Sequence, residues 1–386
     1  MPEKVSTLTE LLARAGAQRF LEAPAPEDMG LAEHLPFPFL GIIGQQEMKL
    51  ALLLSLINPN IGGALLIGPR GTGKTTGVRS LSDLLPGVER SSCLYGCLPD
   101  DIETGGMDAV CPDCAKRYAE GDPLTYSDRV RLIELPLNSK LEDVVGGLDE
   151  RASIHQRMRI ERGILARADQ NILYIDEVNL LDDEIVDAIL DAATQGIYTV
   201  HRGPLAATYR ARFILIGSMN PEEGRLRPQI LDRFGLRVTV HGLEKKKDRL
   251  SAYQRAMAHR SNPRKVIAEL ADATEQIRIE LEAARKDLKD VEISPQAERF
   301  ALSLIEELGI HSLRAELTLF EAARTHAIAD GRKKAIVDDI QRVASMALRL
   351  RRSIFIEEYL SLQDGEDKEI QAISRKLRSA KKKRKR

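Results

Sequence analysis

The chain of 386 residues is long enough for two domains, and its hydrophobic fraction of 43% is ordinary for a globular protein. Aromatic residues make up only 4%, with no tryptophan, which disfavours a nucleic-acid binder that stacks bases on aromatic side chains. The net charge of −1 gives no hint that the partner is anionic. No apolar run in the sequence is long enough to span a membrane. The acidic N-terminus lacks an apolar signal core, so a cytoplasmic location is expected.

The first part of the chain alternates between segments predicted to be helices and short apolar segments predicted to be strands. Residues 1–35 are expected to form an N-terminal extension. The predicted helices cover 45–57, 74–85 and 184–194, and the predicted strands cover 64–67, 172–175 and 213–216. Apolar runs without polar alternation are typical of buried parallel strands, so this pattern predicts an α/β domain with helices on both faces of a parallel sheet.

Beyond about residue 245 the pattern becomes helical. Four helices are predicted there, over 263–288, 295–308, 312–330 and 337–350. The expected organisation is an α/β core over 36–245 with a four-cysteine insert near 93–114, an all-α domain over 246–355, and a polar, basic tail over 356–386. The tail is expected to be a solvated segment rather than a nucleic-acid-binding arm.

A phosphate-binding loop follows the first predicted strand. The residues Gly68, Pro69, Arg70, Gly71, Thr72, Gly73, Lys74 and Thr75 match the pattern G-x-x-x-x-G-K-[ST]. Glycines let backbone amides approach a phosphate closely, and the N-terminus of the following helix adds partial positive charge. Lys74 can reach the β- and γ-phosphates, and the Thr75 hydroxyl can ligate Mg²⁺. This loop, extended to Thr76, is therefore predicted to bind ATP.

Polar residues follow the second and third predicted strands. Asp176 is predicted to hold Mg²⁺ through water, and Glu177 beside it to orient or deprotonate the attacking water. The alternative is an acidic pair that only begins a loop. Asn220 is predicted to hydrogen-bond the attacking water or the γ-phosphate, with a simple turn before Pro221 as the alternative.

Two arginines are candidates for roles at the nucleotide site. Arg233 lies between a predicted short helix and a strand-like segment, where an arginine can project into a neighbouring subunit's site and stabilise the charge of the transferring phosphoryl group. Arg314 lies at the start of the predicted helix 312–330, which suits a cation that reports the nucleotide state to the helical domain. A solvated surface arginine is the alternative for Arg233.

The cysteines form two short-spaced pairs, Cys93 with Cys97 and Cys111 with Cys114. Four thiolates can form a closed tetrahedral Zn²⁺ site, which would brace the insert and perform no chemistry. Redox-active thiols and unligated cysteines are the alternatives.

Taken together, the order of these motifs resembles that of AAA+ ATPases. More narrowly, the chain resembles the AAA+ motor subunit (subunit I) of magnesium chelatase, the enzyme that inserts Mg²⁺ into protoporphyrin IX. The resemblance covers roughly residues 36–352. The matching strings include Tyr174-Ile175-Asp176-Glu177-Val178-Asn179-Leu180-Leu181, Asn220-Pro221-Glu222-Glu223-Gly224 and Leu231-Asp232-Arg233-Phe234-Gly235-Leu236. Those around Asn220 to Leu236 are far more specific than the phosphate-binding loop alone.

The resemblance implies an αβα AAA+ core with a helical lid, and a β-hairpin within 196–212. It also implies ATP and Mg²⁺ as cofactors, with Gly44 and Gln45 near the adenine. The partners would be further copies in a hexameric ring, an AAA-like adapter subunit and a large porphyrin-binding subunit that inserts the metal in (bacterio)chlorophyll-type synthesis.

The four cysteines, the N-terminal extension and the basic tail depart from the family pattern. They leave open a related AAA+ remodelling ATPase that acts on another chelatase or on a protein client. A nucleic-acid motor is the weakest alternative, because the predicted hairpin offers only His201 and Arg202 as cations.

Overall fold

A five-stranded parallel sheet forms the centre of the α/β core. The computed structural model describes residues 35–148, 160–224 and 226–352. Within these residues the sheet has the order β4-β5-β8-β1-β9, with every neighbouring pair parallel. Its strands are β1 (Ala64–Ile67), β4 (Leu132–Leu135), β5 (Ile172–Ile175), β8 (Ile214–Met219) and β9 (Leu236–Thr239). All residues of β1, β5 and β8 are buried, which explains their continuous apolar sequence and confirms the predicted parallel sheet.

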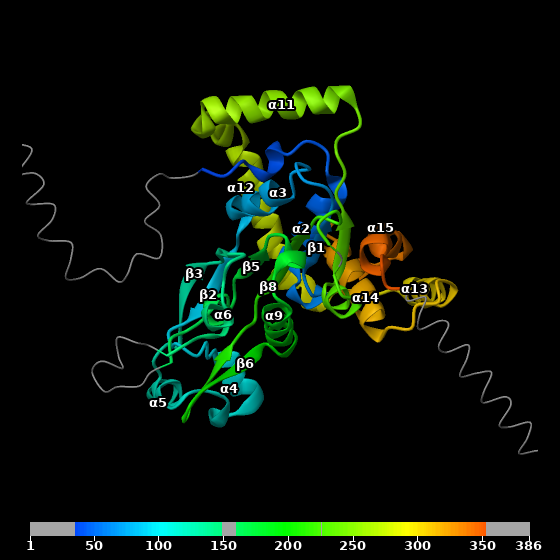
Figure 1. The fold of residues 1–386 in the computed structure, drawn as a ribbon. Helices are drawn as coiled ribbons and strands as arrows, with labels where there is room; N and C mark the ends of the chain where they lie inside the picture. Colours follow the sequence, from blue (N-terminus) through cyan, green and yellow to red (C-terminus); the bar gives the residue numbers. More distant parts are fainter. Residues whose placement is uncertain (1–34, 149–159, 225, 353–386) are drawn as a thin grey trace, which may run out of the picture. The chain divides into compact units, whose positions relative to one another are not determined.

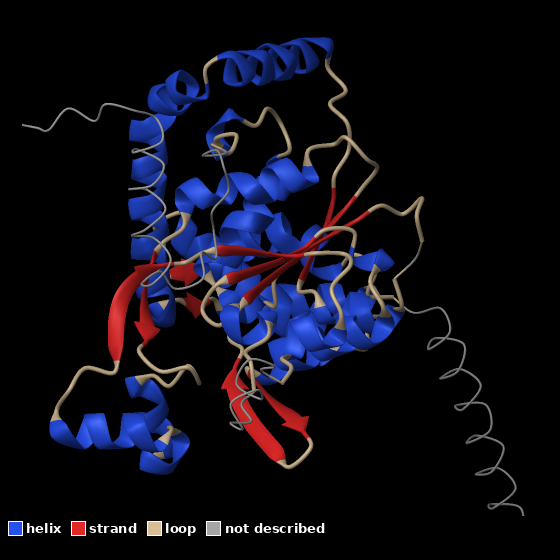
Figure 2. Cartoon of the chain, turned by 60° about the vertical axis from the view of Figure 1, so that its left-hand side comes forward, coloured by secondary structure: helices blue, strands red, loops and turns tan. Residues whose placement is uncertain are grey.

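Helices cover both faces of this sheet (Figures 1 and 2). Alternate residues of β1 enter separate apolar clusters, because successive strand side chains point to opposite faces: Ala64 and Leu66 enter one, Leu65 and Ile67 the other. The helices of this part are α2 (Gln46–Ile57), α3 (Lys74–Arg79), α6 (Leu141–Val145), α8 (Ile164–Arg167), α9 (Asp183–Gln195) and α10 (Pro228–Arg233). Short 3₁₀ turns are η1 (Phe39–Gly41), η2 (Pro59–Ile61), η3 (Ser80–Leu84), η4 (Met107–Ala109), η5 (Val178–Leu180) and η6 (Leu288–Asp290).

The helix predicted over 74–85 is shorter than expected. Helix α3 ends at Arg79 and continues as the 3₁₀ turn η3. The Ser80 hydroxyl donates to the carbonyl of Gly77 (2.7 Å), and the Ser82 hydroxyl donates to that of Arg79 (2.9 Å). Such local bonds from serine side chains compete with the regular helical pattern, which accounts for the early end.

The C-terminal helical part packs on the sheet through one apolar cluster, which includes Leu66 of β1 together with Leu319 and Ile340 of the helices. The helices are α11 (Lys246–Ser261), α12 (Pro263–Asp287), α13 (Pro295–Glu307), α14 (Leu313–Ala329) and α15 (Val337–Leu348). The predicted all-α composition needs one correction. The two-residue strands β10 (Glu292–Ile293) and β11 (Lys334–Ala335) pair in parallel, because the turns before α13 and α15 run side by side.

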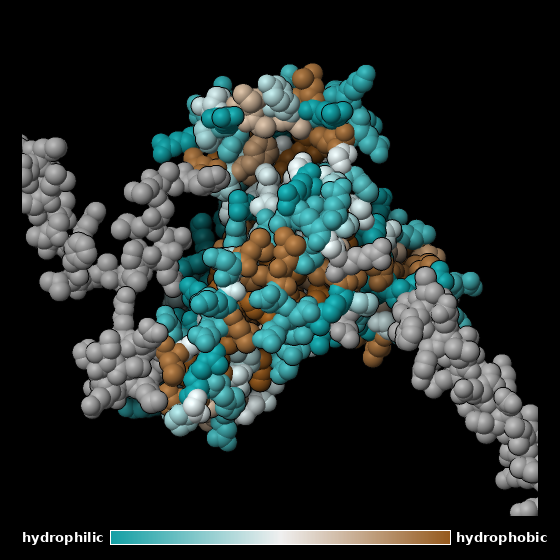
Figure 3. All heavy atoms as spheres, in the orientation of Figure 1, coloured by the Kyte–Doolittle hydropathy of each residue, from teal (hydrophilic) through white to brown (hydrophobic). Residues whose placement is uncertain are grey.

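Helix α11 was not among the predicted helices. None of its residues is buried, so it has no apolar stripe facing the core from which it could be predicted. Its large apolar residues Leu250, Tyr253 and Met257 are exposed. Figure 3 shows hydrophilic and apolar residues mixed over this helix.

Two further antiparallel pairs extend from the core. Strands β2 (Gly87–Ser91) and β3 (Thr125–Arg129) flank an insert that contains α4 (Pro99–Gly105), α5 (Pro112–Glu120) and all the cysteines. Strands β6 (Ile197–Arg202) and β7 (Leu205–Arg210) form the hairpin predicted within 196–212. Residues 1–34 of the predicted extension over 1–35, and the whole of the predicted tail over 356–386, lie outside the described residues. In the described ranges no helix is both long and apolar enough to cross a bilayer.

Candidate nucleotide-binding site

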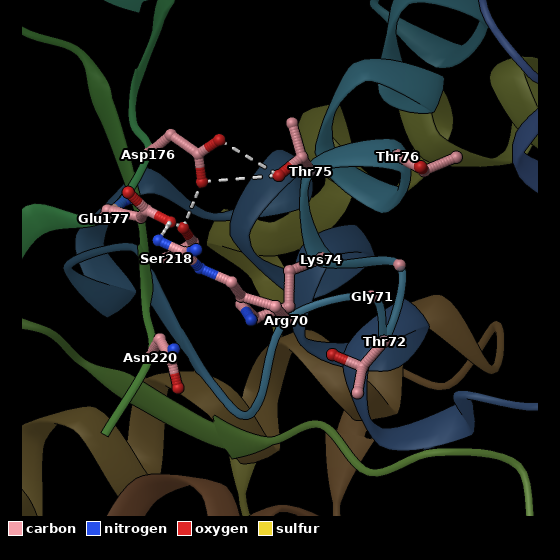
Figure 4. Close-up of a pocket in the computed structure, with 11 residues that line it drawn as sticks. Arg70, Gly71, Thr72, Lys74, Thr75, Thr76, Asp176, Glu177, Ser218 and Asn220 are labelled. Carbon is pink, nitrogen blue, oxygen red and sulfur yellow. Dashed lines mark hydrogen bonds and ion pairs between the residues drawn. The ribbon is translucent and has the colours of Figure 1, made fainter. Parts of the chain in front are cut away.

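A pocket lies where β1, β5 and β8 end. The carboxyl ends of these neighbouring parallel strands meet at one edge of the sheet, so segments far apart in the sequence converge there. The lining residues are Arg70, Gly71, Thr72, Gly73, Lys74, Thr75, Thr76, Asp176, Glu177, Ser218 and Asn220. Figure 4 shows Thr75 of the phosphate-loop motif facing Asp176 at the end of β5, with Ser218 of β8 also beside Asp176.

The loop after β1 has the backbone that a phosphate-binding loop requires. Gly71 and Gly73 have φ values of 75° and 87°, which glycine adopts without strain, and α3 begins directly afterwards at Lys74. The Lys74 ammonium donates to the carbonyls of Gly68 (2.6 Å) and Pro69 (2.8 Å) and therefore lies within the loop. Burial lowers the pKa of Lys74, whereas the nearby negative charge of Asp176, first among the opposing groups, acts to raise it.

Hard oxygen atoms gather beside the loop. The Thr75 hydroxyl lies 3.1 Å from Asp176 Oδ2 and 3.3 Å from Asp176 Oδ1. Tyr174 donates its hydroxyl to Asp176 Oδ1 (2.8 Å). A hydroxyl and a carboxylate in contact are the kind of oxygen ligands that Mg²⁺ takes next to nucleotide phosphates. Thr75 and Asp176 therefore fit a Mg²⁺ ion.

Two residues that were not among the predicted site residues, Ser218 and Tyr174, bond the carboxylate of Asp176. The fully buried Ser218 donates to Asp176 Oδ1, and its oxygen accepts the backbone N–H of Glu177 (3.0 Å). Burial raises the pKa of Tyr174, so its hydroxyl remains a proton donor to Asp176. Ser218 could not be selected from the sequence, because it meets Asp176 only when β8 pairs with β5. Tyr174 lies two residues before Asp176, a spacing that places two side chains on the same face of a strand, and this local signal could have identified it.

The two predicted polar residues at the strand ends differ in their surroundings. Glu177 has a left-handed backbone, with φ 52°, and its carboxylate lies 3.7 Å from the Arg70 guanidinium, which makes a closer ion pair with Glu223. Asn220 is buried and lines the pocket, but its side-chain oxygen also accepts the backbone N–H of Glu222 (3.3 Å). Asn220 therefore makes the turn that sequence analysis offered as the alternative and also faces the pocket.

Gly44 and Gln45 lie beside the pocket rather than in its lining. Gln45 precedes α2 with φ 52°, and its side-chain amide donates to the carbonyls of His241 (2.6 Å) and Thr72 (3.3 Å). Gly44 has φ 66° and packs so closely on Leu243 that a Cβ would lie 2.8 Å from that side chain. Gln45 thus connects the start of α2 with the phosphate-binding loop, and Gly44 packs against the segment after β9.

The structure places the two predicted arginines away from the pocket of their own chain. Arg233 ends α10 and contacts α9, through the hydroxyl of Thr194 and the carboxylate of Asp191 (3.4 Å). Arg314, in the first turn of α14, makes an ion pair with Asp232 (3.0 Å). The described part of the pocket lining includes neither arginine.

Asp232, the neighbour of Arg233, connects the α/β core with the helical part. Besides Arg314, its carboxylate contacts Arg351 (2.8 Å) and Arg237 (3.7 Å), both of which are fully buried side chains. Burial lowers the pKa of Arg237 to about 9, the charge of Arg351 adds to this, and the charge of Asp232 opposes it. Asp232 thus compensates buried positive charge beside the end of α10.

The cysteines converge as the sequence spacing predicts. The Sγ atoms of Cys93, Cys97, Cys111 and Cys114 all lie within 4.8 Å of one another. Cys97 and Cys114 are buried, and the other two are half-buried. This cluster belongs to the insert and does not line the nucleotide pocket.

Comparisons with known proteins agree with this architecture. The AAA lid domain family matches residues 300–373, and the MCM P-loop domain family matches residues 145–245. The magnesium-chelatase subunit ChlI homolog of Methanocaldococcus jannaschii is 41% identical, over 83% of this chain and 87% of the relative. The magnesium-chelatase 38 kDa subunit of Acidiphilium rubrum is 41% identical over 82% and 90%, and the ChlI subunit of a Nostoc species 35% identical over 85% and 87%.

Solved structures give weaker agreement. A crystal structure from Cytophaga hutchinsonii is 18% identical, covers 81% of this chain and 84% of its own, and has a TM-score of 0.51, which supports the fold alone. A cryo-EM-based structure of the complex between subunits BchI and BchD of magnesium chelatase contains a chain that is 38% identical. It covers 84% of this chain and 99% of its own, but its TM-score of 0.45 is too low for a structural comparison.

Proposed function

The chain belongs to the magnesium-chelatase ChlI family of AAA+ P-loop ATPases, and we propose that it is the ATP-hydrolysing motor subunit of a magnesium chelatase complex. In this proposal a cytoplasmic hexameric ring hydrolyses ATP and drives a partner subunit to insert Mg²⁺ into protoporphyrin IX. The observation that carries the proposal is the convergence of Lys74, Thr75, Asp176 and Glu177 in one pocket. The partners are those that the family resemblance implies, an AAA-like adapter and a large porphyrin-binding subunit.

Each of the pocket residues has a separate proposed role in phosphoryl transfer to water. The loop amides and Lys74 would bind the β- and γ-phosphates, so that charge developing on the leaving group is already compensated. Thr75 and Asp176 would hold Mg²⁺, which neutralises phosphate charge when bound. Glu177 would take a proton from the attacking water, and Asn220 would orient that water.

The positions of Arg233 and Arg314 support a site that is completed by a neighbouring subunit. Arg233 lies at the end of α10 and does not line the pocket of its own chain, so its proposed partner is the nucleotide of the next copy. Its planar cation would stabilise charge spread over the phosphoryl oxygens. Arg314 contacts Asp232, the residue before Arg233, and we propose that it transmits the nucleotide state between the helical lid and this arginine.

The proposed cofactors are ATP, Mg²⁺ and a structural Zn²⁺. The four cysteine thiols lie close enough together to ligate one ion, and they lie outside the nucleotide pocket. The zinc would therefore support the insert and take no part in hydrolysis.

The direct test is Lys74→Ala, with Lys333→Ala, an exposed lysine of the lid region, as the matched control. We expect Lys74→Ala to lose ATP hydrolysis, because no other described lysine lines the pocket, and the control to retain it. Unchanged turnover in Lys74→Ala would refute the site.

Reconstitution with porphyrin, Mg²⁺ and the partner subunits then tests the client by metalloporphyrin absorbance. Active ATP hydrolysis without metalloporphyrin formation would favour the alternative, a remodelling ATPase with another client, which the four-cysteine insert leaves open.

A further inference from the structure

The insert between β2 and β3 has too little apolar core to order itself. Its cluster of buried residues consists of Cys97, Ile102, Cys114 and Leu124, with Cys93, Val110 and Cys111 packed against them. Most members of this cluster are cysteines. Segments of this size, below about 40 residues, usually need a metal or disulfides to fold, because they bury too little apolar surface.

The four sulfur atoms have the arrangement of a metal site. In a tetrahedral zinc site with Zn–S bonds of about 2.3 Å, neighbouring sulfurs lie about 3.8 Å apart, so atoms within 4.8 Å of one another need only a small contraction. Backbone N–H groups already point at two of them: the N–H of Cys97 lies 3.4 Å from Cys93 Sγ, and that of Cys111 lies 3.3 Å from Cys97 Sγ. Such N–H donors stabilise thiolate ligands and fix their orientation.

The loop between the first two cysteines packs against the end of the hairpin. The Arg210 N–H, at the end of β7, donates to the carbonyl of Tyr95 (3.0 Å). The ring of Tyr95 stacks on that of Tyr209, with centroids 5.7 Å apart. Gly96 has φ 81°, and a Cβ there would lie 2.9 Å from the Cβ of Arg210, so the two backbones approach as closely as glycine allows.

Charged contacts strengthen this attachment. Arg212, just after β7, donates to the carbonyl of Gly96 (2.5 Å) and makes an ion pair with Asp101 of α4 (3.3 Å). Arg210 makes a second ion pair with Asp101 (3.3 Å). The Asp101 carboxylate also accepts the backbone N–H of Leu98, which directly follows Cys97. The segment 95–101 therefore joins the cysteine cluster to β7 and to Arg212 just after it.

We propose that the four cysteines bind one structural Zn²⁺ and that this ion, by fixing the loop from Cys93 to Cys97, holds the β6–β7 hairpin in place. The inference rests on the zinc site of the proposed function and assigns it a target, the hairpin. Zinc removal frees the loop between the first two ligands, so the N–H of Arg210 and the ring of Tyr209 lose their contacts with Tyr95, while the ring contact between Tyr209 and Tyr198 remains. The β6–β7 hairpin then opens more often, although the five-stranded sheet is unchanged.

The first measurement is metal content and ligand type in the full-length protein. We expect about one zinc per chain. Exchange of the ion for Co²⁺ should give the intense thiolate-to-metal absorption and the visible bands of a tetrahedral site. Purified protein that is folded, free of metal and unable to bind Co²⁺, or that contains disulfides between these cysteines, would overturn the zinc site.

The second measurement is hydrogen exchange of the wild-type protein before and after zinc removal by a chelator. We expect exchange in residues 197–210 to accelerate at least tenfold, with exchange in β5 unchanged as the internal control. Cys114→Ser should reproduce this acceleration together with zinc loss. Tyr95→Ala should retain zinc yet accelerate exchange of the hairpin, because it removes only the ring contact. If the purified protein contains zinc but removal of the zinc leaves hydrogen exchange of the hairpin unchanged, the zinc site stands and its proposed role in holding the hairpin is refuted.

Binding of a fluorescent ATP analogue separates this inference from the proposed function. We expect the zinc-free protein to bind nucleotide within about twofold of the wild type, because no cysteine lines the pocket. Lys74→Ala should lose nucleotide binding but keep the zinc content and the hairpin exchange of the wild type. If zinc removal also abolished nucleotide binding, or if Lys74→Ala also lost zinc, the two sites would not be independent and the inference would be wrong.

Discussion

Ser218 offers the sharpest test of how the catalytic carboxylates are held. Its hydroxyl donates to Asp176, and its oxygen accepts the N–H of Glu177 (3.0 Å). Ser218→Ala removes both bonds and introduces no new atoms. A hydrogen bond to a charged group contributes about 1.5–3 kcal/mol. At about 1.4 kcal/mol per tenfold, loss of this positioning should lower kcat by roughly 10- to 100-fold if the bond is fully used in the transition state.

The assay is steady-state ATP hydrolysis titrated with Mg²⁺, together with nucleotide binding. We expect kcat to fall and the Mg²⁺ concentration for half-maximal rate to rise, because Asp176 is the residue that loses a donor. Nucleotide binding measured without Mg²⁺ should stay within about twofold, because the Lys74 loop is unchanged. Ser82→Ala is the matched control, since Ser82 is exposed and bonds only the Arg79 carbonyl among the described contacts. Values of kcat and Mg²⁺ dependence within twofold of the wild type would show that Ser218 does not position the carboxylates.

Two further predictions concern the ring and the sheet. Arg233→Ala should bind nucleotide but lose hydrolysis in the assembled ring, and mixing it with Glu177→Gln subunits should restore part of the activity; absence of any rescue would argue against a shared site. Gly63→Ala should unfold the protein or lower Tm steeply, because the new Cβ at φ 75° would lie 1.9 Å from the carbonyl oxygen of Leu215. Gly203→Ala, at φ 58° with open space around it, should cost only about 1 kcal/mol, and equal melting curves for the two variants would contradict this reasoning.

The sequence by itself determined most of the central sheet, with the exception of β4, and most of the polar residues at its edge. The glycine and lysine pattern after β1 and the acidic pair after β5 are local signals, because a strand, a turn and a helix must follow one another within a few residues. Parallel strands then place their carboxyl ends together, so Thr75 and Asp176 could be expected to meet. The cysteine spacing likewise predicted a cluster that the structure contains.

Only the tertiary structure decided which other side chains hydrogen-bond to the predicted site residues. Ser218 contacts Asp176 because β5 pairs with β8 in one register, with Ile175 opposite Gly217, and no local pattern encodes that pairing. Tyr174 lies only two residues before Asp176, but the bond between the two side chains depends on how each is oriented in the folded chain. Helix α11 was missed because a helix without buried residues leaves no periodic signal.

The attachment of the cysteine loop to β7 was also decided by the tertiary structure. Tyr95 and Tyr209 are far apart in the sequence, and contacts of that kind depend on where the whole chain places two surfaces. The sequence therefore determined which chemical groups the protein has and where the sheet gathers them. The packing of distant segments decided how those groups are oriented, because hydrogen bonds and ring contacts act only over a few ångströms in space, however far apart their residues lie in the chain.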